Sequence, residues 1–100
     1  MISVIIPAYN EEKALPNTLR ALFALQGDYE VIVVDGGSSD RTAEIVRAVG
    51  LSHQSSALRP VRLLTAPKGR ASQMNAGAKQ SKSEWLLFLH ADTVLPSGAI

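Results

Sequence analysis

Four short apolar runs recur along the chain, and stretches of mixed polarity separate them. The runs are Ser3–Ile6, Glu30–Val34, Val61–Thr65 and Glu84–Leu89. They are rich in aliphatic residues and too short for an ordinary helix, so they predict strands that are buried on both faces.

The first stretch between these runs has the apolar spacing of a helix. Residues at i, i+4, i+7 and i+8 are apolar: Leu15, Leu19, Leu22 and Phe23. This spacing predicts a regular helix from about Lys13 to Leu25, because Pro16 is tolerated only near a helix start. We expect Asn10–Glu12 to form a capped lead-in and Gly27 to end the helix.

Two more helices are expected farther along the chain. Ser38, Ser39 and Asp40 are candidate N-caps of the second helix, which Gly50 should close, and residues 51–60 should form a loose connection. The third helix, Arg70–Gln80, contains small side chains that would let it lie close to a sheet. The order βαβαβαβ predicts an α/β protein with a parallel sheet and helices on both faces.

Composition narrows the class of protein. The chain has 100 residues, the length of one small domain, with 46% hydrophobic and 19% charged residues, which is typical of a folded protein. A net charge of +1 and 5% aromatic residues argue against nucleic-acid binding. The absence of cysteine excludes disulfides, thiolate nucleophiles and cysteine-based zinc sites.

The two halves of the chain differ in charge. Residues 1–50 hold 4 basic and 7 acidic side chains, whereas residues 51–100 hold 6 and 2. A positive second half suits a phosphate-bearing ligand, although a solvated basic face explains it equally well. The chain shows no signal peptide, and its longest apolar runs are too short to span a bilayer, so we expect no transmembrane segment and a cytoplasmic location.

Candidate chemistry gathers directly after the strands, where parallel α/β sheets bind their ligands. The four segments concerned are Pro7–Glu11, Asp35–Ser38, Ala66–Arg70 and His90–Asp92. Because the carboxyl ends of parallel strands share one edge of the sheet, these segments are expected to meet.

The segment that begins with Asp35 and Gly36 allows two interpretations. Asp35 could accept hydrogen bonds from a ribose or a base edge, with the glycines permitting close approach of a ligand. Alternatively, the segment is a tight turn in which Asp35 caps a nearby amide. The chain lacks both the dinucleotide fingerprint and the P-loop motif, which argues against a dinucleotide oxidoreductase and an NTPase.

The start of the third helix brings cations and free backbone N–H groups together. Lys68, Gly69 and Arg70 could bind a diphosphate there, or they could form an ordinary surface turn. Farther along the helix, Gln73 and Asn75 follow, and we expect Asn75 to tether a loop carbonyl.

His90 and Asp92 follow the fourth strand and should face the same side. Asp92 could hold Mg²⁺ or Mn²⁺ together with phosphate oxygens, or it could simply cap a turn. His53 lies in the polar connection and is given no role.

Together these segments resemble the N-terminal half of a family 2 glycosyltransferase with the GT-A fold. The resemblance covers nearly the whole chain and is strongest in four stretches: Ser3–Glu12, Val31–Thr42, Gly69–Gly77 and Leu89–Thr93. It implies a Rossmann-like parallel sheet of the GT-A type, here truncated, in which residues 1–100 form the nucleotide-sugar-binding half. The combination of these stretches is also similar to a bacterial subgroup labelled for arsenosugar biosynthesis.

The resemblance implies a nucleotide-diphosphate-sugar donor, most often a UDP-sugar, held with Mn²⁺ or Mg²⁺. The expected donor-binding residues are Pro7, Ala8, Tyr9, Glu11, Asp35, Gly36, Lys68, Gly69, Arg70, His90 and Ala91. Asp35 would bond the base, Arg70 would lie by the base or diphosphate, and Asp92 would be the metal-binding last carboxylate of a D-x-D motif. His90 occupies the first position of that motif, where it would be a second candidate metal ligand or a donor to the ribose or sugar.

The resemblance also implies inverting transfer to an acceptor, which the sequence does not identify. No residue here is a credible general base, so that carboxylate is expected beyond Ile100, and the isolated chain is expected to be inactive. An uncovered strand edge should favour self-association. The alternatives are a non-catalytic α/β module and, ranked lower, a sugar nucleotidyltransferase, which would need a glycine-rich basic loop after the first strand.

Overall fold

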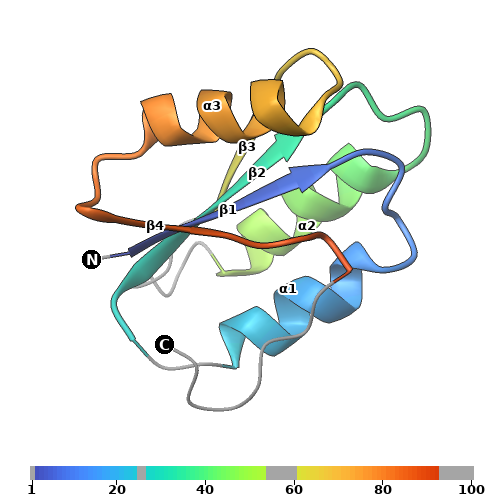
Figure 1. The fold of residues 1–100 in the computed structure, drawn as a ribbon. Coiled ribbons are helices and arrows are strands. Elements are labelled where there is room, and N and C mark those ends of the chain that lie inside the picture. Colours follow the sequence, from blue (N-terminus) through green and yellow to red (C-terminus); the bar gives the residue numbers. More distant parts are fainter. Residues whose placement is uncertain (1, 25–26, 54–60, 93–100) are drawn as a thin grey trace.

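The protein forms a four-stranded parallel sheet. The computed structural model describes residues 2–24, 27–53 and 61–92. The strands are β1 (Ile2–Ala8), β2 (Tyr29–Asp35), β3 (Val61–Thr65) and β4 (Trp85–Phe88), in the order β3-β2-β1-β4 (Figure 1). β1 pairs with both β2 and β4, so the first strand of the chain lies in the interior of the sheet.

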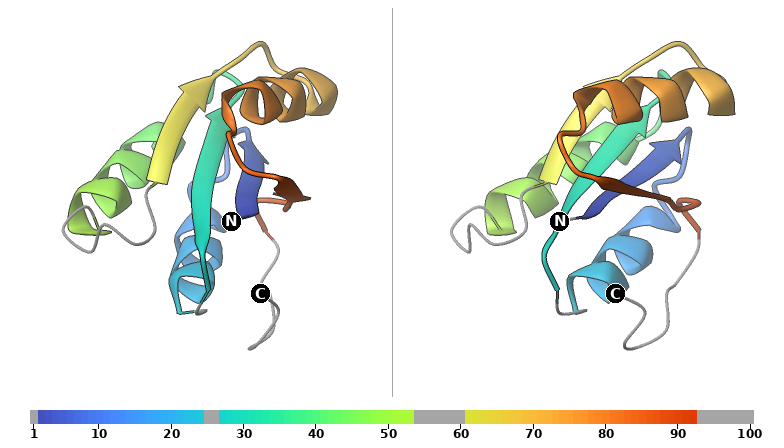
Figure 2. Two further views of the ribbon diagram at one scale, coloured as in Figure 1. Left: turned by 90° about the vertical axis from the view of Figure 1, so that its left-hand side faces the viewer. Right: turned by 60° about the vertical axis from the view of Figure 1, so that its left-hand side comes forward.

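Helices cover both faces of the sheet, which confirms the predicted βαβαβαβ architecture. α1 (Leu15–Phe23) and α2 (Thr42–His53) lie on one face, and α3 (Arg70–Gln80) lies on the other (Figure 2). No helix within the described ranges has the length and apolar character needed to cross a membrane.

The alternation of side chains along β1 and β2 divides the core between the two faces. Val4 and Ile6 are fully buried in the cluster that includes residues of α1 and α2. Ile5 and Ile32, which are paired across β1 and β2, belong to the cluster below α3. Both central strands are therefore apolar on each face, as their continuous aliphatic sequence predicts.

α3 lies close to the sheet because a glycine faces it. A Cβ atom on Gly77 would lie 2.5 Å from Ile5 Cγ2 and 3.2 Å from Val34 Cγ2. The close approach expected from the small residues of this helix is thus confirmed at Gly77.

The element boundaries differ from the expected ones in several places, and β1 and β2 both extend beyond the apolar runs that predicted them. Gly50 does not close α2, which continues to His53, because the helix accepts one interior glycine at a cost of about 1 kcal/mol. α1 begins later than expected, after the N-cap Ala14, and places Pro16 in its first turn. It also ends earlier than expected, at Phe23 with the C-cap Ala24, so Gly27 does not end this helix. β4 is shorter than the expected strand by one residue at each end. Of the expected loose connection, residues 54–60 lie outside the described residues, as do residues 25–26 near the expected end of α1.

A polar cluster lies at the amino ends of the strands, away from the segments that carry candidate chemistry. Ser3 Oγ lies 2.7 Å from Glu30 Oε2 and 2.8 Å from Ser83 Oγ, and it accepts a hydrogen bond from Ser81 Oγ at 2.5 Å. Arg62 Nη1 lies 3.7 Å from Glu30 Oε1. These contacts join β1, β2 and β3 to the connection between α3 and β4.

Candidate functional site

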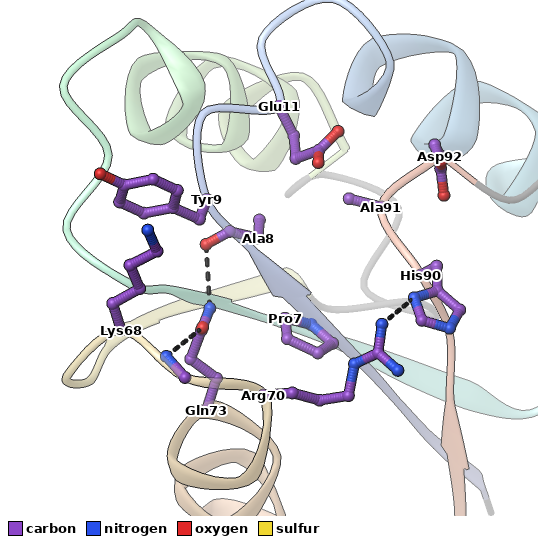
Figure 3. Close-up of a pocket in the computed structure, with 11 residues that line it drawn as sticks. Pro7, Ala8, Tyr9, Glu11, Lys68, Arg70, Gln73, His90, Ala91 and Asp92 are labelled. Carbon is purple, nitrogen blue, oxygen red and sulfur yellow. Dashed lines mark hydrogen bonds between the residues drawn. The ribbon is translucent and has the colours of Figure 1, made fainter.

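A pocket of about 350 Å³ lies at the carboxyl ends of the strands, beside the start of α3 (Figure 3). Its size falls within the range of small-molecule sites. The lining residues come from the end of β1 and the loop after it, from the start of α3 and the residues before it, and from the segment after β4: Pro7, Ala8, Tyr9, Glu11, Lys68, Gly69, Arg70, Gln73, His90, Ala91 and Asp92. Nine of the eleven residues expected to bind a donor are therefore gathered in one pocket, together with Asp92.

Asp35 and Gly36 do not line this pocket. Asp35 is only 5% exposed, and its carboxylate accepts hydrogen bonds from the backbone N–H of Ser38 at 3.2 and 3.3 Å and from the Ser38 hydroxyl. Gly36 packs against the Gln73 amide, where a Cβ atom would lie 2.9 Å from Oε1. In this structure the segment forms a tight turn capped by Asp35.

The loops after β1 and β2 are tied to each other. Asn10 adopts φ = 52°, a left-handed conformation that asparagine tolerates, and its Oδ1 accepts a hydrogen bond from Ser39 N at 2.8 Å. Glu11 N donates to Thr42 Oγ1 at 2.9 Å. The loop that carries Tyr9 and Glu11 into the pocket is thus anchored at the start of α2.

Asp40 joins the same two loops. Its carboxylate accepts hydrogen bonds from Thr42 N at 2.9 Å, from Thr42 Oγ1 and from Glu12 N at 3.2 Å. Desolvation alone would raise the pKa of Asp40, but these hydrogen bonds outweigh it and hold the pKa below its ordinary value of 3.8. Asp40 lies one residue before the N-cap position, Arg41, whose carbonyl accepts the first hydrogen bond of α2, and its carboxylate binds the free N–H of Thr42 in the first turn.

Gln73 lines the same pocket, although its sequence position did not point to a role there. It is 4% exposed, and its Nε2 donates to Ala8 O at 2.9 Å and Val34 O at 2.8 Å, while Oε1 accepts from Gly69 N at 3.1 Å (Figure 3). Asn75 was expected to tether a loop carbonyl, but this is wrong: Asn75 is exposed, and Gln73 makes the tether. The available signal was its spacing, since Gln73 precedes the sheet-facing Gly77 by four residues and so shares its face.

Each of the two cationic side chains of the pocket contacts an aromatic or imidazole side chain. Lys68 Nζ lies 4.1 Å from the centroid of the Tyr9 ring, a cation–π contact. Arg70 Nη2 lies 3.0 Å from His90 Nδ1 (Figure 3). Both charged groups remain exposed at the pocket, so they are available to an anionic ligand.

The segment after β4 is pinned so that alternate residues face the pocket. Leu89 N donates to Ile5 O at 2.9 Å, and the side chains of Leu89 and Ala91 are buried in the core. Thr18 Oγ1, on α1, donates to Ala91 O at 2.5 Å. His90 and Asp92 are left exposed at the same pocket, as the alternation predicts.

The acidic groups of the pocket are sparse. Glu11 and Asp92 line it, and within residues 2–24, 27–53 and 61–92 no three histidine or acidic side chains come together as a ready-made metal site. Within the part of the chain that the structure describes, Glu11 and Asp92 are thus the acidic side chains at this pocket that could bind a divalent ion.

Comparison with known proteins places the chain in a family. The family model described as glycosyl transferase family 2 matches residues 3–100. The chain is 37% identical over 100 residues to an undecaprenyl-phosphate 4-deoxy-4-formamido-L-arabinose transferase of Pseudomonas aeruginosa, covering 96% of this chain and 29% of that protein. It is also 33% identical over 99 residues to a poly-beta-1,6-N-acetyl-D-glucosamine synthase of Staphylococcus epidermidis, covering 98% of this chain and 23% of that protein, so the chain spans less than a third of the length of these relatives.

Solved structures agree with this assignment. A mannosyltransferase from Pyrobaculum calidifontis in complex with GDP-Man and Mn²⁺ superposes with a TM-score of 0.87 at 27% identity, over 96% of this chain and 28% of that one. Staphylococcus aureus TarS 1–349 in complex with UDP gives a TM-score of 0.70 at 31% identity, over 91% of this chain and 27% of that one. The sheet, the position of the pocket and the match over nearly all residues lead to one conclusion: the chain belongs to glycosyltransferase family 2.

Proposed function

We propose that residues 1–100 form the nucleotide-sugar-binding part of a glycosyltransferase, with a nucleotide-diphosphate sugar as ligand. The observation that carries this proposal is the pocket, which brings together three strand-end segments with cations and acidic groups. It is supported by the structural neighbours, one bound to GDP-Man and the other to UDP. A UDP-sugar remains the expected donor.

The diphosphate would bind at the start of α3. Lys68 and Arg70 supply two positive charges, and the first turn of α3 has no side-chain cap among the described residues. Uncapped N–H groups at a helix start favour an anion. This arrangement contrasts with α2, where the Asp40 carboxylate already caps the first turn.

Asp92 fits the role of a ligand to Mn²⁺ or Mg²⁺. Its carboxylate is exposed at the pocket, and among the described residues no hydrogen bond or ion pair engages it. These ions commonly take one or two protein carboxylates and complete their shell with phosphates and water. When bound, the ion would neutralise charge on the leaving diphosphate, and Arg70 and Lys68 would supply further positive charge to the same group.

The nucleoside would lie against the segment after β1. Pro7 and Ala8 offer apolar surface, Tyr9 offers a ring, and Glu11 offers a carboxylate that can accept hydrogen bonds from hydroxyl groups. The expected contact between Asp35 and the base stays a prediction, and it requires a carboxylate lone pair that Ser38 does not use.

The remaining expectations also stay predictions. These are inverting transfer, the acceptor, a general base beyond Ile100, the subgroup labelled for arsenosugar biosynthesis and the cytoplasmic location. The chain covers less than a third of its curated relatives, so complete transferase activity is proposed for the whole protein and not for these residues alone.

Isothermal titration calorimetry tests the proposal. The chain is titrated with UDP and GDP, each with Mn²⁺ and with EDTA. We expect binding that Mn²⁺ strengthens, and an Arg70→Ala variant that weakens it roughly tenfold or more in both buffers, because it removes a charge-assisted contact. Lys79→Ala is the matched control, since it removes a cation from the last turn of the same helix.

Asp92→Ala should weaken binding only when Mn²⁺ is present. An equal loss in EDTA would show that Asp92 acts as a turn cap instead of a metal ligand. If neither nucleotide binds at millimolar concentration, the proposal fails for this chain.

A further inference from the structure

The contact between Arg70 and His90 fixes how the imidazole is protonated. Arg70 Nη2 lies 3.0 Å from His90 Nδ1, at the pocket (Figure 3). A guanidinium has only donors and keeps its proton in proteins, so Nδ1 must be the acceptor. In the neutral ring the hydrogen therefore lies on Nε2.

Neither ring nitrogen is then suited to bind a divalent ion. A metal ligand needs a free nitrogen lone pair, but the lone pair of Nδ1 faces Arg70 and Nε2 carries the hydrogen. A metal ion at Nδ1 would also replace the contact with Arg70 and lie beside its positive charge. The contact between Arg70 and His90 therefore argues against His90 as a metal ligand.

We propose that His90 positions Arg70 through Nδ1 and donates its Nε2–H to an oxygen of the bound nucleotide sugar, leaving Asp92 as the protein's metal ligand. The inference rests on the proposed donor site and assigns a role within it. The oxygen that accepts this hydrogen bond would belong to a phosphate or hydroxyl group, since a nucleotide sugar carries both kinds of oxygen.

The surroundings of Arg70 support a positioning role. The side chain is long and exposed at the first position of α3, so on its own it would lose considerable rotamer freedom when it binds a ligand. A small apolar cavity of about 120 Å³ adjoins the pair, lined by Arg70 and His90 with Pro7, Met74, Phe88 and Leu89. The apolar stem of Arg70 can lie along this surface while His90 directs the guanidinium.

Nuclear magnetic resonance of the imidazole nitrogens tests the assignment directly. The chain has two histidines, so a His53→Gln variant leaves His90 as the only imidazole. At pH 8 we expect ¹⁵N signals of the Nε2–H tautomer that do not move when Mg²⁺ is added in the absence of nucleotide. Adding Arg70→Ala should turn this single tautomer into a mixture.

Two results would overturn the proposal: an Nδ1–H tautomer in the unliganded protein, or displacement of the ring nitrogen signals by Mg²⁺ added without nucleotide. This readout needs no nucleotide binding. A protein that shows the expected tautomer but binds neither UDP nor GDP would retain the Arg70–His90 pair and refute the proposed donor site.

Binding by variants tests the function of the pair. His90→Ala should weaken UDP or GDP binding roughly tenfold, and by the same factor in EDTA and in Mn²⁺. His90→Asn should recover part of this loss, because its amide oxygen can accept the hydrogen bond from Arg70. A loss confined to the Mn²⁺ buffer would instead identify His90 as a metal ligand.

Discussion

Gln73 organises the pocket at the scale of single residues. Its buried amide makes three hydrogen bonds to backbone groups of Ala8, Val34 and Gly69, which lie at the ends of β1 and β2 and at the N-cap of α3. Gly36 lies against the same amide and leaves no room for a side chain. The pocket walls are therefore joined by one neutral side chain that does not itself offer a charge to a ligand.

Replacing Gln73 should destabilise the protein. Gln73→Met keeps the length of the side chain but leaves the Gly69 N–H without its partner, so we expect the free energy of unfolding to fall by about 1–3 kcal/mol. Asn75→Ala is the matched control at an exposed position of α3, and it should change the free energy of unfolding by no more than about 0.5 kcal/mol. Urea denaturation measures both, and a larger effect at Asn75 would contradict the assigned tether.

The sequence predicted most of the pocket but not its internal support. Pro7, Lys68 and His90 could be found because ligands bind after the strands of parallel sheets, a rule that depends only on the order of elements. The choice between Gln73 and Asn75 depends on the exact rotation of α3 about its axis, which Gly77 sets by its contact with Ile5. The position of Asp35 depends on a hydrogen bond with Ser38 that competes with any ligand.

At the scale of elements, the start of α2 holds the loop after β1. Asp40 connects the two, and hydrogen bonds lower its pKa below 3.8. A folded-state pKa below the unfolded value contributes stability that is fully present above about pH 5 and is lost as pH falls through the folded-state pKa. Asp40→Asn should therefore be less stable than the wild-type chain at neutral pH, and the difference should vanish in acid.

Chemical denaturation between pH 2.5 and pH 7 measures this difference. Glu44→Gln provides the control, because the Arg41–Glu44 ion pair is exposed on both sides and surface pairs of this kind contribute little. A stability difference between Asp40→Asn and wild type that is constant over this pH range would refute the role of the Asp40 carboxylate.

Strands and helices differ in how well the sequence predicted them. β3 and α3 have the expected bounds, because clear apolar and polar boundaries flank them. The end of α2 was predicted wrongly at Gly50, where the local cost of glycine is small enough for the helix to continue. Local preference thus identified each element, whereas tertiary packing determined its length.

At the scale of the whole molecule, β4 is the least covered strand. In the part of the chain that the structure describes, it pairs only with β1, and Trp85 is 68% exposed, with Leu86 and Phe88 also exposed. Because an apolar strand edge can pair with another such edge, we expect two copies of this chain to associate through β4.

Sedimentation velocity tests this association. The wild-type chain should sediment as a dimer with increasing concentration, and Leu86→Lys should shift it toward the monomer because a charge would have to be buried. Ala71→Lys makes the same change on the exposed surface of α3 and should have no effect. A wild-type chain that stays monomeric at high concentration would show that β4 does not pair with itself.

The central claim is that the carboxyl ends of the strands bind a nucleoside diphosphate. The most direct measurement is a backbone ¹H–¹⁵N titration of the chain with UDP and GDP in the presence of Mg²⁺. We expect shifts at Tyr9, at Lys68–Arg70 and at His90–Asp92, with none at the opposite cluster of Ser3 and Ser83. Shifts confined to the Ser3 cluster, or no shifts at millimolar nucleotide, would contradict it.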